Sequence, residues 1–148
     1  MSEEKYKTLA VYLESAIGIV KQMGLKVIAM KDRYVKLQMP IKENINHVGT
    51  MYAGSLFTLG EIMGGAIFIA SFDMRKYYPI VKDVQIHYRR PAMTDITVEL
   101  AMSEDQVKQI TAALEEKGKA DFPLELDLVD ANGEVVSIVR GVWQGRKK

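Results

Sequence analysis

The sequence contains no cysteine, which excludes disulfide bonds, thiolate nucleophiles and thiolate metal sites. It has only two histidines, His47 and His87, far apart and without other ligand residues at metal-binding spacing. We therefore expect no metal site, and a Ser-His catalytic pair is not indicated. The glycines form neither a dinucleotide fingerprint nor a P-loop, and Ser55 lacks the G-x-S-x-G elbow. Several common kinds of catalytic centre are thus excluded.

Neither sign of charge dominates, because 20 Lys and Arg residues face 19 Asp and Glu residues. A chain without a basic field is not expected to bind nucleic acid. The first residues mix acids and lysines with no apolar run behind them, unlike a secretory signal, so we expect a cytoplasmic protein. A length of 148 residues predicts one domain, spanning residues 1–148.

One long apolar segment is present, from Met51 to Phe72, and its only charged residue is Glu61. This pattern predicts a helix that is buried on nearly every side. The length would also suit a membrane span, but a carboxylate near the middle, four glycines and flanking amphipathic strands favour a core helix. We therefore expect no membrane partner.

The remaining segments predict strands and two further helices. Apolar spacings of three and four residues predict an amphipathic helix over residues 3–23, ended by Gly24, and Ser103 caps a shorter helix over 103–117. Strands are expected at 25–30, 34–39, 80–89, 96–102, 122–129 and 135–143. The fold class is therefore α+β, with an antiparallel sheet of about six strands wrapped around a long central helix.

The candidate site lies between Asn46 and Glu61, where small residues open the apolar helix. The first amides of a helix have no intrahelical partner, so the amides at Ala53 and Gly54 can polarise a carbonyl oxygen. A carboxylate in apolar surroundings has a raised pKa, which suits Glu61 as a general base or nucleophile. A buried Glu61 paired with a Lys or Arg is the alternative.

The spacing of the two groups indicates a dimer. Ala53 and Glu61 are eight residues apart, which is about 12 Å along a helix, so they cannot both contact one carbonyl. Two antiparallel helices related by a two-fold axis would bring the amide of one chain to the carboxylate of the other. We therefore expect a homodimer, and a dimer of dimers stays open.

The motif resembles that of the hotdog-fold thioesterases, in particular the phenylacetic-acid-pathway type. Asn46, Gly49, Tyr52-Ala53-Gly54 and Glu61 match the spacing of the family motif, and Pro91-Ala92 is similar to its Pro-Ala. The order of expected elements agrees over nearly the whole chain. The resemblance implies a hotdog fold, hydrolysis of an acyl-CoA or other acyl thioester, and no cofactor beyond the coenzyme A of the substrate.

The resemblance also implies roles for individual residues. Ala53 would offer the amide that polarises the thioester carbonyl, Asn46 would hold the carbonyl or the attacking water, and Glu61 would be the base or nucleophile. The chain departs from the family at two positions. Tyr52 replaces a histidine, and Ala53 replaces a glycine, so the alanine methyl narrows the approach to the amide.

Further residues are candidates for binding the substrate. Tyr52 and His47 belong to the motif segment, and Lys82 with Asp83 falls where the family often has a Ser or Thr that positions water. Arg89-Arg90 could contact the phosphates of coenzyme A, because guanidinium groups bind phosphate well. Solvated surface charges are the alternative for these four residues.

Two other functions stay open on the sequence. A non-catalytic acyl-CoA binder would explain the missing histidine and glycine. A hotdog hydratase or dehydratase would need a well-placed histidine, and neither His47 nor His87 stands at that family's position. The sequence does not indicate the acyl group.

Overall fold

The computed structural model describes residues 3–148. Helices α1 (Glu3–Ser15) and α2 (Gly18–Met23) precede a hairpin of β1 (Lys26–Lys31) and β2 (Tyr34–Met39). A 3-10 turn (Lys42–Asn44) then leads to the long helix α3 (Ala53–Ser71). The chain continues through β3 (Tyr77–Tyr88), β4 (Ile96–Ala101), α4 (Glu104–Lys117), β5 (Lys119–Val129) and β6 (Val135–Lys147).

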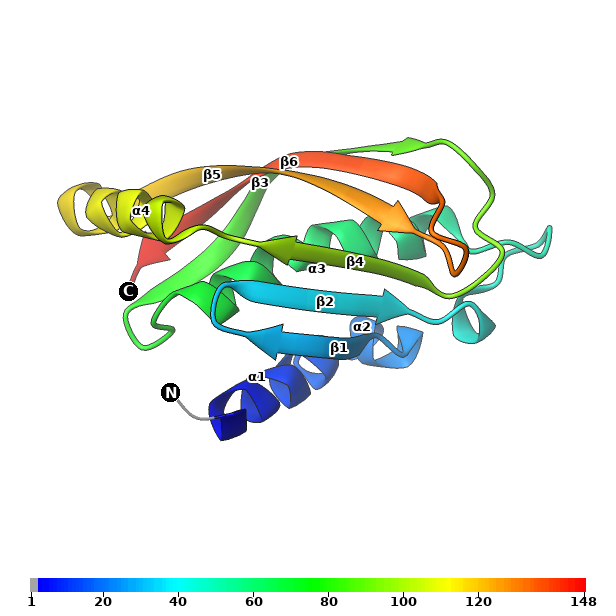
Figure 1. The fold of residues 1–148 in the computed structure, drawn as a ribbon, viewed down its shortest axis with the longest axis horizontal. Coiled ribbons are helices and arrows are strands. Elements are labelled where there is room, and N and C mark those ends of the chain that lie inside the picture. The colour runs from blue at the N-terminus through cyan, green and yellow to red at the C-terminus, as the bar shows by residue number, and fades with distance from the viewer. Residues whose placement is uncertain (1–2) are drawn as a thin grey trace.

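The six strands form one antiparallel sheet in the order β1-β2-β4-β5-β6-β3. Helix α3 lies against the inner face of this curved sheet, α1 lies beside β1, and α4 lies beside the start of β5 (Figure 1). The buried apolar residues form a continuous core between α3 and the sheet. The predicted α+β architecture with a central helix is confirmed.

Helix α3 is buried because nearly all its side chains are apolar, and two of its glycines let the sheet approach closely. A side chain at Gly60 would collide with Val139, and one at Gly64 would collide with the indole of Trp143, both on β6. By length and composition α3 could cross a membrane, yet 67% of its most apolar window is buried within the protein. This degree of burial is typical of a helix in the core of a protein.

The prediction of one continuous helix over residues 3–23 is wrong. The helix breaks at residues 16–17, where Ile17 adopts an extended conformation before Gly18 starts α2. The break allows Leu13 on α1 and Val20 on α2 both to be buried. Gly24 ends α2 in the left-handed conformation, as the sequence predicts.

Strand β3 lies at one edge of the sheet and pairs only with β6. Its register places Val81 opposite Trp143, whose ring packs on α3, so Val81 points to the inner face of the sheet. Val81 is nevertheless 44% exposed, and Tyr88 near the end of the same strand is 46% exposed. The structure therefore leaves a long strand edge and part of its apolar inner face uncovered.

Candidate active site

The start of α3 is held in place by Asn44, a residue that the sequence analysis missed. The buried Asn44 amide donates to the main-chain oxygens of Met23 and Pro40, and its side-chain oxygen accepts from the hydroxyl of Ser55 in the first turn of α3. The Asn44 carbonyl also accepts the N–H of Tyr52. A polar residue between a predicted strand and the motif segment gives no sequence signal for such a role.

Asn46 shapes the loop before α3. Its side-chain oxygen accepts the N–H groups of Val48 and Thr50, and its amide donates to the Thr50 hydroxyl at 2.9 Å. Gly49 has a φ of 86°, a left-handed conformation that favours glycine. Both ends of the Asn46 amide are thus engaged in the loop. To hold a substrate or a water, Asn46 would have to give up one of these bonds.

The amide of Ala53, the first residue of α3, is free to bind a ligand. Tyr52 precedes the helix and gives no side-chain cap, and no hydrogen bond from the Ala53 amide is formed within the described residues. The Tyr52 ring lies against Gly54, at the position where a side chain of Gly54 would be. Position 54 therefore has to be glycine while Tyr52 holds this conformation, and the exposed Ala53 remains accessible.

A surface pocket of about 430 Å³ opens at this end of α3. Its lining includes Asn46, Thr50, Ala53, Tyr88, Arg89 and Arg90. The hydroxyl of Tyr88 donates to the Ala53 carbonyl oxygen at 2.9 Å and so ties the end of β3 to the first turn of α3. Burial, and then the nearby Tyr52, raise the pKa of Tyr88 above its usual value. Tyr88 was missed because a tyrosine in a strand gives no functional signal on its own.

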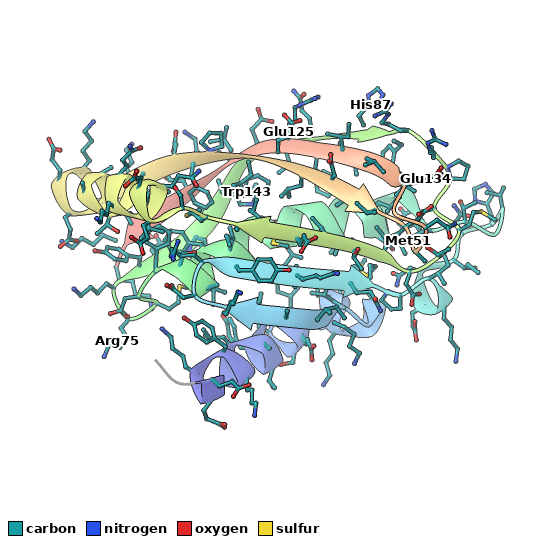
Figure 2. All side chains as sticks on the ribbon, in the orientation of Figure 1. Met51, Arg75, His87, Glu125, Glu134 and Trp143 are labelled. Atoms are coloured by element: carbon teal, nitrogen blue, oxygen red, sulfur yellow. The ribbon has the colours of Figure 1, made fainter. Side chains whose placement is uncertain are left out.

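The two arginines give this pocket a positive rim. Both Arg89 and Arg90 are exposed, and Arg90 pairs with Glu134 of the last hairpin at 3.4 Å. Figure 2 shows Glu134 and Met51 at the same end of the molecule, with Arg75 at the opposite end. Of the predicted residues, Asn46, Ala53, Arg89 and Arg90 thus lie together.

Glu61 is half-buried, two turns further along α3. Burial raises the pKa of its carboxyl above the usual value, and the nearby indole N–H of Trp143 opposes this rise only in part. That N–H donates to the main-chain oxygen of Glu61 at 3.1 Å, not to its carboxylate. Among the ion pairs within residues 3–148, none involves Glu61. The alternative of a paired, structural Glu61 is therefore not found in the single chain.

Ala53 and Glu61 lie on the one open face of α3. The residues Ala53, Phe57, Glu61 and Gly65 follow each other at intervals of four, so they share a face of the helix. Phe57 is 36% exposed, an unusual degree for a phenylalanine on a core helix. Since about 12 Å of rise separates Ala53 from Glu61, one chain does not bring both groups to one carbonyl.

Lys82 and Asp83 lie away from the pocket, whereas His47 lies between Asn46 and Val48, which both line it. Lys82 forms an ion pair with Asp121 at 2.9 Å, and Asp83 lines a shallow groove beside the exposed Arg140. His87 projects from the outer side of the sheet (Figure 2), and His47 is exposed on the loop before α3. Within the described part of the chain, no group of three or more His, Asp or Glu side chains could hold a metal ion.

Comparison with known families assigns the chain to a protein family. A family model described as "Putative thioesterase (yiiD_Cterm)" matches residues 6–144. The chain belongs to this family. The predicted membership of the hotdog-fold thioesterase superfamily is thereby confirmed, and the six-stranded sheet around α3 is its hotdog fold.

Solved structures agree with the family. A Pseudomonas aeruginosa protein described as a probable thioesterase is 41% identical, with a TM-score of 0.91 over 97% of this chain and 96% of its own. Two more distant structures share the fold. A Chlorobaculum tepidum protein of unknown function is 20% identical with a TM-score of 0.84, covering 96% of this chain and 94% of its own. A Haemophilus influenzae thioesterase is 12% identical with a TM-score of 0.73, covering 95% and 90%. The comparison with curated proteins gave no match.

Proposed function

We propose that this member of the thioesterase family hydrolyses acyl-CoA thioesters as a homodimer, with each active site shared between two chains. The thioester carbonyl binds at the Ala53 amide of one chain, and Glu61 of the partner subunit activates the attacking water. The family supports a thioester hydrolase in general. The acyl-CoA substrate and the shared site are the proposal.

The observation that carries the proposal is the unpaired carboxylate of Glu61 on an otherwise apolar helix. Burial without a cationic partner is unfavourable for the ionised form, so such a group is rarely retained for stability. A raised pKa brings a carboxylate closer to the basicity that proton abstraction near neutral pH requires. Glu61 therefore has the properties of a general base.

The uncovered strand edge supports the dimer. A twelve-residue edge strand with free N–H and C=O groups readily pairs with another chain. The inner-face residues Val81 and Tyr88 are exposed beside the open face of α3, where Phe57 is also exposed. A second copy that pairs along β3 and packs on α3 would bury all of this surface. Such a contact is isologous, as a two-fold axis requires.

The proposed shared site requires one particular register of this dimer. Position 57 lies midway between positions 53 and 61. If the axis passes at Phe57 of both antiparallel helices, Ala53 of each chain faces Glu61 of the partner subunit. A Phe57→Cys variant should therefore form a disulfide-linked dimer under mild oxidation, whereas a cysteine at the exposed Ala112 of α4 should not.

The reaction follows from these positions. The partner's Glu61 takes a proton from water as the water oxygen attacks the thioester carbon, and the Ala53 N–H stabilises the negative charge that develops on the carbonyl oxygen. Collapse of the tetrahedral intermediate breaks the C–S bond, and the proton on Glu61 neutralises the departing thiolate. Arg89 and Arg90 hold the phosphates of coenzyme A at the rim. Direct attack by Glu61 to form an anhydride uses the same geometry.

The test is a thiol-release assay on CoA thioesters with short, medium, long and aromatic acyl groups. We expect release by the wild-type protein, and loss of at least about 100-fold in kcat for Glu61→Gln, which keeps the shape of the side chain. Glu134→Gln, at the rim but away from the carbonyl, is the control and should keep its kcat. Full turnover by Glu61→Gln would exclude Glu61 as base and as nucleophile.

One observation favours a second candidate, a non-catalytic acyl-CoA binder. The amide of Asn46, which the family resemblance assigns to the carbonyl or the water, is fully engaged in its own loop. If calorimetry shows saturable binding of CoA thioesters while no thiol is released from any of them, the binder is correct and the hydrolase is not.

A further inference from the structure

We infer that Trp143 is a positioning residue for Glu61. Its indole N–H, held against the turn of α3 that carries Glu61, favours the ionised carboxylate and so sets the pH at which the site works. This inference rests on the proposed function and concerns the group that tunes the proposed general base.

The polar atom of Trp143 lies at Glu61. Trp143 is the only tryptophan of the chain, and on β6 it is 1% exposed. A buried indole N–H needs an acceptor, because an unpaired donor in the core is unfavourable. Its acceptor is the main-chain oxygen of Glu61, at 3.1 Å and 82 residues away in sequence. The core thus directs its one indole N–H to the residue that we propose as the base.

Two glycines make room for the ring at this place. A side chain at Gly64 would overlap the indole nitrogen, and one at Gly141 would collide with the far edge of the ring. Glycine weakens both the interior of a helix and the interior of a strand. Both positions therefore keep an unfavourable residue, and the ring is fixed with its N–H at Glu61.

The helix does not need this hydrogen bond. A main-chain oxygen inside an α-helix accepts the N–H four residues further on, which for Glu61 is the N–H of Gly65. The bond from Trp143 is an additional one, so its loss leaves no unpaired acceptor. What it adds is the positive end of the indole dipole beside the glutamate. The carboxyl responds to it, since burial raises the pKa of Glu61 and the indole lowers it.

No charged side chain of the packed strands competes with the indole. The register turns apolar residues of β3 and β6 toward this part of α3, namely Val81, Val84 and Val139. The charged residues of these strands lie on the outer side of the sheet, where Lys82 pairs with Asp121 and where Asp83 and Arg140 line a shallow groove. Strands β2, β4 and β5 contribute buried apolar residues to the core, and α1 meets α3 near residues 69–71.

The proposed dimer would bring further titratable groups near Glu61. They belong to the other end of the shared site and are the partner subunit's His47, Tyr52, Tyr88, Arg89 and Arg90. All of them stay the same in the variants below. A difference between these variants therefore reports the indole.

The test measures the pKa of Glu61 without requiring turnover. Carbon-13 NMR follows the side-chain carboxyls through a pH titration, and Glu61→Gln identifies the Glu61 signal by its absence. Trp143→Phe keeps an aromatic ring and removes the N–H. Phe68→Leu changes a buried aromatic residue about two turns further along α3 and is the matched control.

We expect the midpoint of Glu61 to rise by about half a unit to one unit in Trp143→Phe, because a donor beside the charge is lost. The acid limb of the pH profile of kcat/KM should move with it, so that thiol release falls about three- to tenfold below the midpoint and much less above it. Phe68→Leu should lower stability and leave the midpoint in place. If Trp143→Phe does not fold, replacement of Trp143 by benzothienylalanine, which has a sulfur in place of the N–H, repeats the comparison.

Fluorescence gives a second readout, because Trp143 is the sole tryptophan. In the wild type its emission should change with the midpoint of Glu61, and in Glu61→Gln this change should be absent. Emission that does not follow Glu61 in the wild type would overturn the inference.

The inference also fails if the midpoint of Glu61 is unchanged or lower in folded Trp143→Phe. An equal loss of turnover at every pH, with an unchanged midpoint, would make Trp143 a structural residue only. If the wild type releases no thiol from any CoA thioester while the midpoint rises as expected, the proposed function fails and the positioning of Glu61 by Trp143 stands.

Discussion

Replacing Ala53 by proline removes one hydrogen-bond donor and leaves the rest of the site in place. Ala53 is the first residue of α3, the helical position that best tolerates proline because its N–H has no acceptor within the helix. The preceding Tyr52 has φ −57° and ψ 135°, within the extended region that proline favours for its predecessor. The backbone therefore accepts Ala53→Pro without rearrangement.

The expected effects on stability and on turnover are opposite. A proline at a compatible position raises the free energy of unfolding by about 0.4–1 kcal/mol, which corresponds to a rise in Tm of up to about 4 °C. Loss of one oxyanion donor lowers kcat by about 100- to 1,000-fold. The loss should appear in kcat more than in KM, since the N–H acts on charge that develops in the transition state.

The assay is steady-state thiol release beside calorimetric unfolding. Ala53→Gly is the matched control, because it keeps the N–H and removes the methyl that narrows the approach, so it should be at least as active as the wild type. Wild-type kcat in a folded Ala53→Pro protein would refute the assignment of this amide as the oxyanion donor.

Three further variants test other parts of the account. Because burial raises the pKa of Glu61 in the folded state, the stability of the wild type falls as the pH rises through that pKa. Glu61→Gln should therefore have a higher Tm than the wild type at pH 8, and this difference should disappear at pH 4. An equal difference in Tm at both pH values would contradict the raised pKa of Glu61. Gly64→Ala should lower stability by about 1–3 kcal/mol in urea unfolding, because its methyl would overlap the Trp143 ring, and an unchanged midpoint would show that the ring moves aside. Val81→Lys places a charge on the uncovered inner face of β3 and should yield monomers by size exclusion, whereas Lys82→Ala on the same strand should not.

Much of the fold could be predicted because the central helix and the strands each have a clear hydrophobic pattern. A single charged residue in the segment from Met51 to Phe72 indicated a central helix, and alternation indicated the strands. The break at residues 16–17 could not be predicted, since the apolar spacing continues across it and only the packing of Leu13 and Val20 distinguishes two helices from one. Tertiary packing there outweighs the local pattern.

The sequence was sufficient to identify some residues of the candidate site, but it did not indicate the hydrogen bonds and ion pairs that their side chains form. Ala53 could be identified because the first amides of a helix have no intrahelical partner. Glu61 could be identified because it is the only charged residue in an apolar segment. Asn44 and Tyr88 could not be identified, because each acts through a hydrogen bond to a segment distant in sequence. Lys82 has a structural partner, Asp121, on a strand whose register the sequence does not specify.

Mixing two inactive variants tests the shared active site most directly. Ala53→Pro and Glu61→Gln homodimers each lack one group at both sites, but a heterodimer contains one intact site, with Ala53 from one chain and Glu61 from the other. After unfolding and refolding together, random pairing should restore about one quarter of the wild-type thiol release, because half of the dimers are mixed and each has one working site. If mixed dimers form and release no more thiol than the separate variants, Ala53 and Glu61 do not act together across two chains.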